Sequence, residues 1–598
     1  MQTNAAPLSP TSPTSLFLAA SAMLAICGPA WLAYNVSPSA TFLNQALSLG
    51  GWGWLLALTA LCLSKADGER SWSQVLPLAL AFFLVALGVG GSLLLHRLPS
   101  SLALSALGLI FGGCLAALTG AMRGHRAFQA LCVGLLLAGL VNLPVAVVQV
   151  FAPTSIEGDW IARAGAQGRA GGNLRQPNHL SSLLLWSLAA LVWLHDTLVE
   201  KSNDRQRVLA VRCVTAVSLI GLIFGDVLTV SRTGTVCVFL LALWGVLDRN
   251  LSRFTRMLLW AAPLIYGLCW LGMSEWSRAA GAGFIGDAQL QKSDLSSSRF
   301  AIWSNTIDLI KQNPWLGVGW GEFNFAWSLT PFPNRPVAFF DHTHNLPLNL
   351  LVELGIPLGT LALALLAWSL WKAFVACRIT PQPHSTMVRT AFVMVLMMVV
   401  HSMLEYPLWY AYFLLPTAFA LGICLGHSTP QDAAVEAAPA SPRLRQALVV
   451  ASLLLVAGTV FSVFDYLKVT KIFAVDDDDT TPLSYRIAQG QKSVFFAHHA
   501  DYAAATVATH PSTAWKAFRR APHLLLDTRL MMAWAKAYAE KGDIERARYI
   551  ADRLREFRNP DSAEFFAECD KAKTAGTPEP FQCKPATRQF TYQDFKLR

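Results

Sequence analysis

Charge is scarce in this chain: only 14% of its 598 residues are Asp, Glu, Lys or Arg, whereas 54% are hydrophobic. Soluble domains carry about 25% charged residues, so the composition excludes a chain that folds wholly in water. Residues 1–14 contain no Lys or Arg, which are typical of the start of a cleavable signal peptide. The first apolar run is therefore expected to be a retained helix. The net charge of +10 reflects the loops described below and does not indicate a nucleic-acid partner.

Cysteine is also sparse outside the apolar runs. Nine of the 11 cysteines fall in or beside such runs and are expected to be reduced packing residues. Cys569 and Cys583 lie nearer the C-terminus, where an oxidising compartment would allow them to pair, and the sequence leaves both states open. No cluster of Cys and His has the spacing of a structural zinc site.

Long apolar runs are what the chain has in abundance. A transmembrane helix needs roughly 17–25 apolar residues, and about thirteen such runs predict an all-α, polytopic membrane protein. They are 15–34, 44–64, 76–95, 101–121, 127–150, 179–198, 208–229, 233–248, 257–273, 346–371, 387–404, 408–426 and 446–465.

The distribution of Lys and Arg predicts the orientation, because cytoplasmic loops are enriched in both. The even-numbered connections carry most of them: Lys65 and Arg70; Arg123 and Arg126; Lys201, Arg205 and Arg207; Arg249, Arg253 and Arg256; Lys372, Arg378 and Arg389; Arg443 and Arg445. The N-terminus is therefore expected in the cytoplasm, and an odd number of helices places the C-terminal domain outside. In a bacterial inner membrane that side is the periplasm.

A long polar segment at about 274–344 ends at Asp341-His-Thr-His-Asn345, where an apolar helix begins. Pro347 fits the first turn of that helix because its missing N–H is not needed there. Imidazoles at a water–membrane boundary, beside a helix N-terminus that favours anions, are placed for proton transfer next to a phosphate. Other polar groups are expected on the same outer face: Gln176, Asn178 and His179 before the sixth helix, Arg232 in the seventh connection, Arg299 in the ninth, and Glu405 and Tyr406 in the eleventh.

Each of these residues also has a structural interpretation. Gln176-Pro-Asn-His179 can form a turn before a helix, and an interfacial histidine can cap one. Arg232 can be a snorkelling anchor, and Arg299 can lie on a solvated amphipathic helix. Their gathering on one predicted face favours a functional site over scattered anchors.

The composition changes after Phe464, which predicts a membrane domain at 1–466 and a helical domain at 467–598. The acidic run Asp476–Asp479 is expected to be a solvated linker or domain edge. Residues Leu530–Tyr549 alternate small and large apolar side chains at helical spacing, with a break at Gly542-Asp543, as in a tetratricopeptide-like hairpin.

Several motifs resemble a known family. The stretch His344-Asn345-x-x-Leu348-x-x-Leu351-x-Glu353-x-Gly355-Ile356 resembles the signature of the bacterial O-antigen ligase and polymerase (Wzy_C) superfamily. Gln176-Pro-Asn-His179 and His401-Ser-x-x-Glu405-Tyr406-Pro407 are similar to PglL-type protein O-oligosaccharyltransferases, and Ser231-Arg232-Thr233-Gly234 and Ser298-Arg299 also match the superfamily. The resemblance covers roughly residues 130–430.

The resemblance implies transfer of a preassembled glycan from undecaprenyl diphosphate to Ser or Thr hydroxyls of an exported or pilin-like protein, in the periplasm. It assigns the essential histidine to His344 and diphosphate binding to Arg232 and Arg299. Gln176 and Tyr406 match further residues required for activity, Asn178, Asn345 and Glu405 are expected to support them, and His342 either supports His344 or competes for its role. No cofactor or metal is expected, since the outer face has no Asp-x-Asp motif apart from the acidic run.

Three alternative functions are also compatible with the sequence. A ligase acting on lipid A core or an O-antigen polymerase would use a sugar hydroxyl as acceptor. A lipid-linked glycan transporter would more often show internal repeats and ionisable residues near the bilayer midplane. A structural scaffold would leave the outward arginines unexplained.

Overall fold

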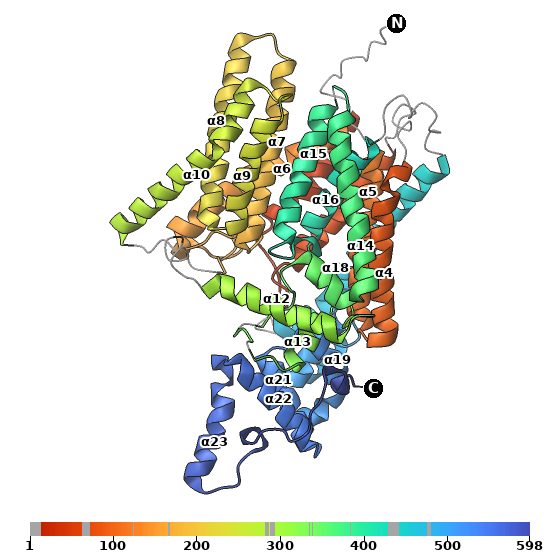
Figure 1. The fold of residues 1–598 in the computed structure, drawn as a ribbon, viewed down its shortest axis with the longest axis vertical. Coiled ribbons are helices and arrows are strands. Elements are labelled where there is room, and N and C mark those ends of the chain that lie inside the picture. Colours follow the sequence, from red (N-terminus) through yellow and green to blue (C-terminus); the bar gives the residue numbers. More distant parts are fainter. Residues whose placement is uncertain are drawn as a thin grey trace. The chain divides into compact units, whose positions relative to one another are not determined.

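The computed structural model describes residues 13–61, 72–122, 125–165, 168–281, 286, 294–333, 335–337, 339–382, 384–428, 442–474 and 480–597. Across these ranges the regular elements are helices, and no strand is found (Figure 1). Each of the thirteen apolar runs contains a helix, which confirms the all-α, polytopic fold class. The acidic run Asp476–Asp479 lies outside the described residues.

Nine of the helices in the described ranges are long and apolar enough to cross a membrane, and three shorter apolar helices accompany them at Phe17–Trp31, Arg232–Leu247 and Ala411–Gly426. The remaining run corresponds to α3 (Phe42–Leu61), a helix of 20 residues. The exact number of spans and their orientation stay predictions.

The chain divides into two compact units, which are described separately. Unit 1 comprises Met1–Leu80, Phe111–Lys292 and Leu365–Val460. Its helices are α1 (Pro13–Ala22), α2 (Gly28–Trp31), α3, α6 (His125–Phe151), α7 (Pro177–Glu200), α8 (Arg205–Thr229), α9 (Arg232–Leu247), α10 (Arg253–Ala280), α15 (Ser385–Ser402) and α16 (Ala411–Gly426).

A bundle of neighbouring helices holds unit 1 together. Helices α6 to α10 pack on one another as a group, and α7 also packs on α15 (Figure 1). Helix α7 is the most enclosed of the candidate spans, with Trp186 and Trp193 almost fully buried. The residues just before α7 are therefore anchored to a rigid element.

Unit 2 comprises Ala81–Ile110, Ser293–Ala364 and Phe461–Arg598. Its own helices are α12 (Asp294–Gln312), α13 (Phe323–Leu329), α19 (Leu483–Gly490), α20 (Ala497–Val507), α21 (Thr528–Glu540), α22 (Ile544–Phe557) and α23 (Ala563–Ala575). Four further helices belong partly to each unit: α4 (Leu76–Gly91), α5 (Ser100–Ala121), α14 (Leu346–Ile379) and α18 (Pro442–Phe473).

One hydrophobic core joins the polar segment of unit 2 to its C-terminal helices. Phe325 and Trp327 of α13 are buried in the same cluster as Phe518, Trp534 and Phe557. The segment predicted as a periplasmic loop at about 274–344 thus contains α12 and α13, which fold together with C-terminal residues. The domain boundary at 466/467 stays a prediction.

Side-chain caps define where many of these helices begin. In the C-terminal part of unit 2, Asp527 caps α21 and Asp543 caps α22 by accepting backbone N–H bonds, as Asp commonly does at this position. Gly542, with φ of 82°, supplies the left-handed turn between them. Helices α21 and α22 pack against each other, as the break predicted at Gly542-Asp543 requires. Their assignment as a tetratricopeptide-like repeat stays a prediction.

Candidate functional site

The loop before α7 is built around a buried glutamine of α6. Gln149 accepts hydrogen bonds from the backbone N–H groups of Gly171 and Gly172, at 3.0 and 2.8 Å, and donates to the carbonyls of Ala162 and Gly172. Gly172 has a φ of 62°, and a Cβ there would meet Asn142 Oδ1 at 2.8 Å. Glycine at these positions therefore allows the close approach of the backbone to Gln149 and Asn142.

Gln176 lies at the N-cap of α7, and its side chain accepts a hydrogen bond from the backbone N–H of His179 at 2.7 Å. Pro177 follows in the first turn, as proline commonly does. The structural interpretation of Gln-Pro-Asn-His, a turn that starts a helix, is therefore correct for Gln176. The side-chain N–H groups of Gln176 are not used by this cap.

Asn178 connects three segments that lie far apart in the sequence. Its Nδ2 donates to Glu405 Oε1 at 3.1 Å, and its Oδ1 accepts from Ser231 Oγ at 2.8 Å. Ser231 in turn caps α9 by accepting from the backbone N–H of Gly234 at 3.1 Å. We call Asn178, Ser231, Arg232 and Glu405 the arginine–amide group.

Arg232 is the first residue of α9 and its side chain is exposed. Among the described residues, nothing accepts a hydrogen bond from its guanidinium or forms an ion pair with it. The cation therefore stands at a helix N-terminus, where the backbone N–H groups also favour an anion.

Arg169 is a second cation beside this group, and it is not among the site residues predicted from the sequence motifs. Its guanidinium donates to the carbonyls of Thr229 and Val230 at 3.0 and 3.3 Å. Burial lowers the pKa of Arg169, the Glu405 carboxylate raises it, and the positive charge of Arg232 lowers it. Glu405 is 7% exposed, so a nearly buried carboxylate balances part of the local positive charge. An arginine within a glycine-rich stretch is the signal that could have identified it.

Tyr406 stacks on Tyr410, with ring centroids 6.1 Å apart. Tyr410 also meets the edge of His179 at 4.5 Å, and His179 Nδ1 lies 3.1 Å from the Tyr412 hydroxyl. His179 is buried, so this histidine packs inside unit 1 rather than facing outward. Tyr406 itself is half-buried at the edge of the aromatic cluster.

The second group of predicted residues lies in unit 2 and forms the turn that precedes α14. We call residues 341–345 the histidine turn. His344 has a φ of 53°, in the left-handed region, which only a few per cent of non-glycine residues adopt. Its ring meets Phe340 edge to face, with centroids 5.3 Å apart. Trp303 of α12 donates to the carbonyl of Thr343 at 3.0 Å, and Arg299 precedes it by one helical turn on the same face.

Asn345 caps α14. Its Oδ1 accepts from the backbone N–H of Leu348 at 3.1 Å, and its backbone carbonyl accepts from Thr343 Oγ1 at 2.8 Å. Asn349 Oδ1 accepts from the backbone N–H of Thr343 at 3.2 Å. The Asn of the His-Asn motif therefore orients the turn, and α14 begins at Leu346, as predicted.

His342 pairs with Asp341, with 3.3 Å between Nδ1 and Oδ2. Burial raises the pKa of the Asp341 carboxyl, but the positive charge and hydrogen bond of His342, with a smaller contribution from His344, outweigh it and lower the pKa to about 2. Asp341 is therefore a carboxylate at neutral pH. This pairing distinguishes His342 from His344.

A kink divides α14 into a short first part, which follows the histidine turn directly, and a long second part. Gly355 has φ of 78° and ψ of 168°. The backbone groups released there pair with residues 314–319, through N–H···O bonds from Val318 to Val352, Gly319 to Glu353 and Ile356 to Pro314, at 2.8, 3.1 and 2.7 Å. Glu353, in the last turn before the kink, is 3% exposed.

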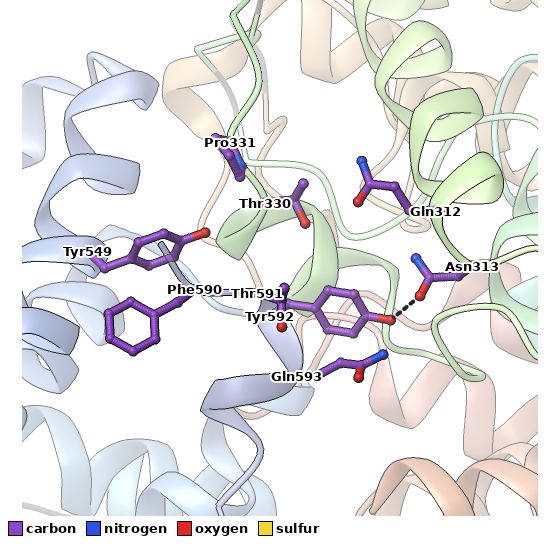
Figure 2. A pocket seen from close by; sticks show the side chains of 9 residues that line it. All are labelled: Gln312, Asn313, Thr330, Pro331, Tyr549, Phe590, Thr591, Tyr592 and Gln593. Carbon is purple, nitrogen blue, oxygen red and sulfur yellow. Dashed lines mark hydrogen bonds between the residues drawn. The ribbon is translucent and has the colours of Figure 1, made fainter. Parts of the chain in front are cut away.

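A separate cleft of about 460 Å³ lies in unit 2, between residues 312–331 and the C-terminal segment (Figure 2). Its wall contains Gln312, Thr330, Tyr549 and Gln593, and Tyr592 donates to Asn313 across it at 2.7 Å. Among the described residues, no Lys, Arg, Asp or Glu side chain lines this cleft, and it contains none of the candidate site residues predicted from the sequence.

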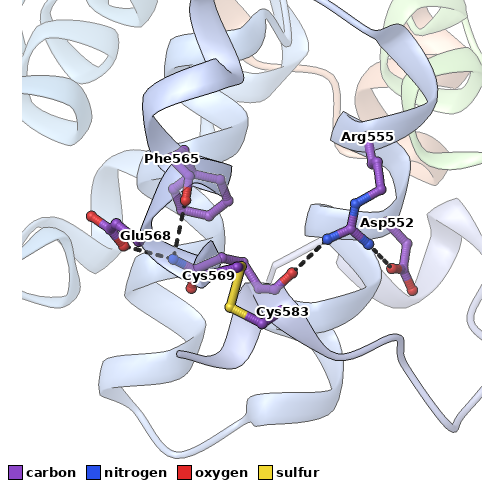
Figure 3. Close-up of a disulfide and its surroundings, with 7 residues drawn as sticks. Asp552, Arg555, Phe565, Glu568, Cys569 and Cys583 are labelled. Atoms are coloured by element: carbon purple, nitrogen blue, oxygen red, sulfur yellow. Dashed lines mark hydrogen bonds and ion pairs between the residues drawn. A yellow bond between two sulfur atoms is a disulfide. The ribbon is translucent and has the colours of Figure 1, made fainter. Parts of the chain in front are cut away.

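Cys569 and Cys583 form a disulfide that ties α23 to the short helix at Phe581–Cys583 (Figure 3). Gln582, next to this bond, donates to Glu568 Oε2 at 2.7 Å, and its carbonyl accepts from Arg555 at 2.8 Å. The pairing left open by the sequence is therefore present in the structure. Among the described residues, no three His, Cys, Asp or Glu side chains are grouped as a metal site would require.

The arginine–amide group and the histidine turn belong to different units, and the structure describes the geometry of each separately. Gln176, Asn178, Arg232, Glu405 and Tyr406 lie in unit 1. Arg299, His342, His344 and Asn345 lie in unit 2.

Comparison with known proteins gives three family matches. Residues 215–364 match the family described as O-Antigen ligase (Wzy_C), residues 170–195 match Protein glycosylation ligase, and residues 389–570 match Virulence factor membrane-bound polymerase, C-terminal. The first match contains Arg232, Arg299 and His344, and the second contains Gln176 and Asn178.

Two curated relatives come from Acinetobacter baylyi (strain ATCC 33305 / BD413 / ADP1). The chain is 28% identical over 270 residues to its General O-oligosaccharyltransferase, covering 44% of each protein. It is 26% identical over 293 residues to its ComP-specific O-oligosaccharyltransferase, covering 47% of each. Each match thus spans less than half of the relative's length.

Proposed function

We propose that the chain is a PglL-type member of the O-antigen ligase superfamily and that it transfers a preassembled oligosaccharide from undecaprenyl diphosphate to Ser or Thr hydroxyls of a protein. The matches of residues 215–364 to the O-antigen ligase family and of residues 170–195 to the protein glycosylation ligase family support this proposal. Both relatives are named as O-oligosaccharyltransferases, which supports this reaction class. The observation that carries the proposal is the bond chain Glu405–Asn178–Ser231, which fixes an exposed Arg232 at the start of α9.

In this proposal Arg232 binds the diphosphate of the donor. A guanidinium presents paired N–H groups that match phosphate oxygens, and the α9 N-terminus adds backbone N–H groups nearby. Arg299 supplies the second cation. Because lipid diphosphate is already a good leaving group, catalysis consists mainly of positioning and of stabilising the charge that develops on it.

His344 acts as the general base. Its imidazole takes the proton of the acceptor hydroxyl as the oxygen attacks the anomeric carbon, and the bond from that carbon to the diphosphate oxygen breaks. Undecaprenyl diphosphate leaves with the bonding electrons, and a single displacement inverts the anomeric carbon. His342 supports this role through Asp341, and the reaction needs neither a metal nor another cofactor.

The proposed location is the bacterial inner membrane, with the N-terminus in the cytoplasm and both site groups in the periplasm. The Lys and Arg distribution supports this orientation. The Cys569–Cys583 disulfide supports an oxidising compartment for the C-terminal part of unit 2, since disulfides persist in the periplasm and are rare in the cytosol. The acceptor is an exported or pilin-like protein.

A second candidate is an O-antigen polymerase or ligase, in which the acceptor hydroxyl belongs to a sugar. The match of residues 389–570 to a polymerase family favours it. The bond chemistry is almost unchanged, so the two candidates differ chiefly in the acceptor.

The experiment is reconstitution of the full chain with lipid-linked oligosaccharide and, in parallel, a panel of exported proteins, lipid A core and a second lipid-linked glycan. We expect glycan on Ser or Thr of a protein, with equal yield in chelator. Product on lipid A core or on the second glycan, with none on protein, would select the second candidate. A strict metal requirement would contradict the metal-independent mechanism.

A further inference from the structure

A cationic groove in unit 2 is not used by the proposed reaction. About 400 Å³ of space lies between the end of α18 and α19, lined by Phe464, Leu467, Lys468, Lys471, Thr481, Tyr485, Arg486 and Gln489. We call this lining the α18–α19 groove. It is distinct from the arginine–amide group and from the histidine turn, because it shares no residue with either.

The groove has one apolar wall and one cationic wall. On α18, the side chains of Phe464 and Leu467 are 67% and 47% exposed. Lys468 and Lys471 follow them directly, and Arg486 of α19 completes three cations. Exposed apolar side chains followed by cations at the end of a helix long and apolar enough to span a membrane mark a boundary between lipid tails and headgroups.

The hydrogen-bonding and charge-pairing capacity of these cations is only partly used by the described residues of the protein. Arg486 donates to the carbonyl of Lys471 at 2.8 Å, while its buried Nε has no hydrogen-bond partner among the described residues. Lys468 pairs with Asp465 at 2.9 Å. Asp465 also accepts from Ser493 Oγ and from two backbone N–H groups, so this carboxylate is shared. A buried donor without an acceptor is costly, and an incoming phosphate oxygen would satisfy it.

We infer that the α18–α19 groove binds the phosphate headgroup of an anionic bilayer phospholipid, with Lys468, Lys471 and Arg486 on the phosphate and the acyl chains along Phe464 and Leu467. Juxtamembrane Lys and Arg attract anionic lipids. The exposed apolar wall favours a lipid over a free phosphate ion, which would leave that wall in water. The inference concerns lipid binding alone and does not depend on the transfer reaction.

The test uses the full chain in nanodiscs of mixed phosphatidylcholine and phosphatidylglycerol, with the lipids that stay bound identified by native mass spectrometry. We expect phosphatidylglycerol to be enriched on the wild type relative to the disc. The K468Q/K471Q/R486Q variant should lose the enrichment, by about fivefold for each cation removed. K471Q alone changes an exposed side chain and should lower the enrichment by about fivefold. It should not affect folding, and thermal unfolding of the variant checks this.

The matched control K516Q/R519Q/K571Q removes the same charge from exposed positions elsewhere in unit 2 and should retain phosphatidylglycerol. Equal loss in the control would reduce the effect to general electrostatic attraction and overturn the inference. So would full enrichment in the groove variant, or displacement of the lipid by inorganic phosphate.

Discussion

At the scale of single residues, the backbone of His344 carries the strongest constraint. A left-handed conformation costs a non-glycine residue about 1–3 kcal/mol and persists only where neighbours enforce it. Here the Asn345 cap, the Thr343 bonds and the Phe340 ring enforce it. Such strain at a turn supports a functional position for this imidazole.

The first prediction compares the two histidines. His344→Ala should lower the initial rate of glycan transfer by about 10²–10⁴-fold, the range for loss of a general base. His342→Ala should lower it less, because that imidazole pairs with Asp341. Single-turnover transfer assays on detergent-purified protein measure both, with thermal unfolding as the folding control. Loss of transfer in His342→Ala alone would reassign the base.

The second prediction concerns Arg232. Arg232→Lys keeps the charge but loses the paired N–H geometry, so the KM for the lipid-linked donor should rise by about tenfold, as expected for roughly 1.4 kcal/mol of lost binding. Arg232→Gln should raise it further. Arg163→Gln, in the exposed part of the loop before α7, is the matched control and should leave the KM unchanged. An unchanged donor KM in both Arg232 variants would show that Arg232 does not bind the diphosphate.

At the scale of elements, the close contact between residues 314–319 and the α14 kink positions the segment after the histidine turn. A Cβ on Gly355 would meet the Trp315 carbonyl oxygen at 2.4 Å, in a backbone conformation of φ 78°. Gly317 approaches Glu353 from the other side, where a Cβ would meet that carbonyl oxygen at 2.5 Å. Glycine is required at both positions because the neighbouring backbone leaves no room for a Cβ, not because these positions need to be flexible.

The third prediction follows from this contact. Gly355→Ala should destabilise unit 2 by about 1–3 kcal/mol, from the strained φ alone, with a further cost from the clash, and transfer should weaken as the histidine turn shifts. Gly90→Ala, at a helical position with nothing within 4 Å of the added Cβ, should be neutral or slightly stabilising. Thermal unfolding of the two variants measures the difference. Equal melting temperatures would show that the pairing contributes nothing.

The helices were predictable from the sequence because apolar runs of membrane-spanning length report burial in lipid directly. The start of α14 was also predictable, since Asn345 and Pro347 carry local signals that act within one turn. The kink at Gly355 has a local signal that the run 346–371 contains, since Pro357 lies inside it and a proline kinks or ends a helix just before its own position. The pairing of the kink with residues 314–319 was not predictable, because those residues lie some forty positions earlier in the chain.

The candidate site was predictable in residue type more than in role. Sequence motifs selected Asn178, Arg232 and Glu405, and in the structure Asn178 bonds both Glu405 and Ser231, the residue before Arg232. They could not show that Gln176 caps a helix, because the same residues fit a turn or a ligand contact. Arg169 was missed because its position beside Arg232 depends on hydrogen bonds to the carbonyls of residues 229 and 230, which are distant in sequence.

At the scale of the whole molecule, the C-terminal disulfide closes a loop of 14 residues. Loop-closure entropy gives such a bond about 3 kcal/mol of stabilisation. A Cys569→Ser/Cys583→Ser variant should therefore unfold at a lower temperature, with the loss confined to the α23 region, where hydrogen exchange should accelerate. Cys213→Ser, at an exposed unpaired cysteine, is the control. Unchanged hydrogen exchange in α23 would show that the Gln582 contacts hold this region without the disulfide.

The last prediction is an acid sensitivity of unit 2 that arises from two histidines of α20. Burial lowers the pKa of His499 from 6.5 to about 4, and burial, with the charges of His499 and Arg520, lowers the pKa of His498 well below its usual value. The unfolded chain then binds more protons than the folded chain between these pKa values, so the stabilisation is full above pH 6.5 and is lost as the pH falls towards 4. Asp501 acts in the opposite direction at lower pH, because burial raises the pKa of its carboxyl from 3.8.

Thermal unfolding of the full chain in detergent, compared between about pH 7.5 and pH 5 where histidine titrates, should show a lower melting temperature at the acidic end. His499→Gln should reduce this difference, since an amide has no proton to gain. His510→Gln replaces an exposed histidine of the same unit, whose side chain is 74% exposed, and should leave the difference unchanged. If both variants reduced the difference in melting temperature equally, the acid sensitivity would follow net charge rather than the burial of α20.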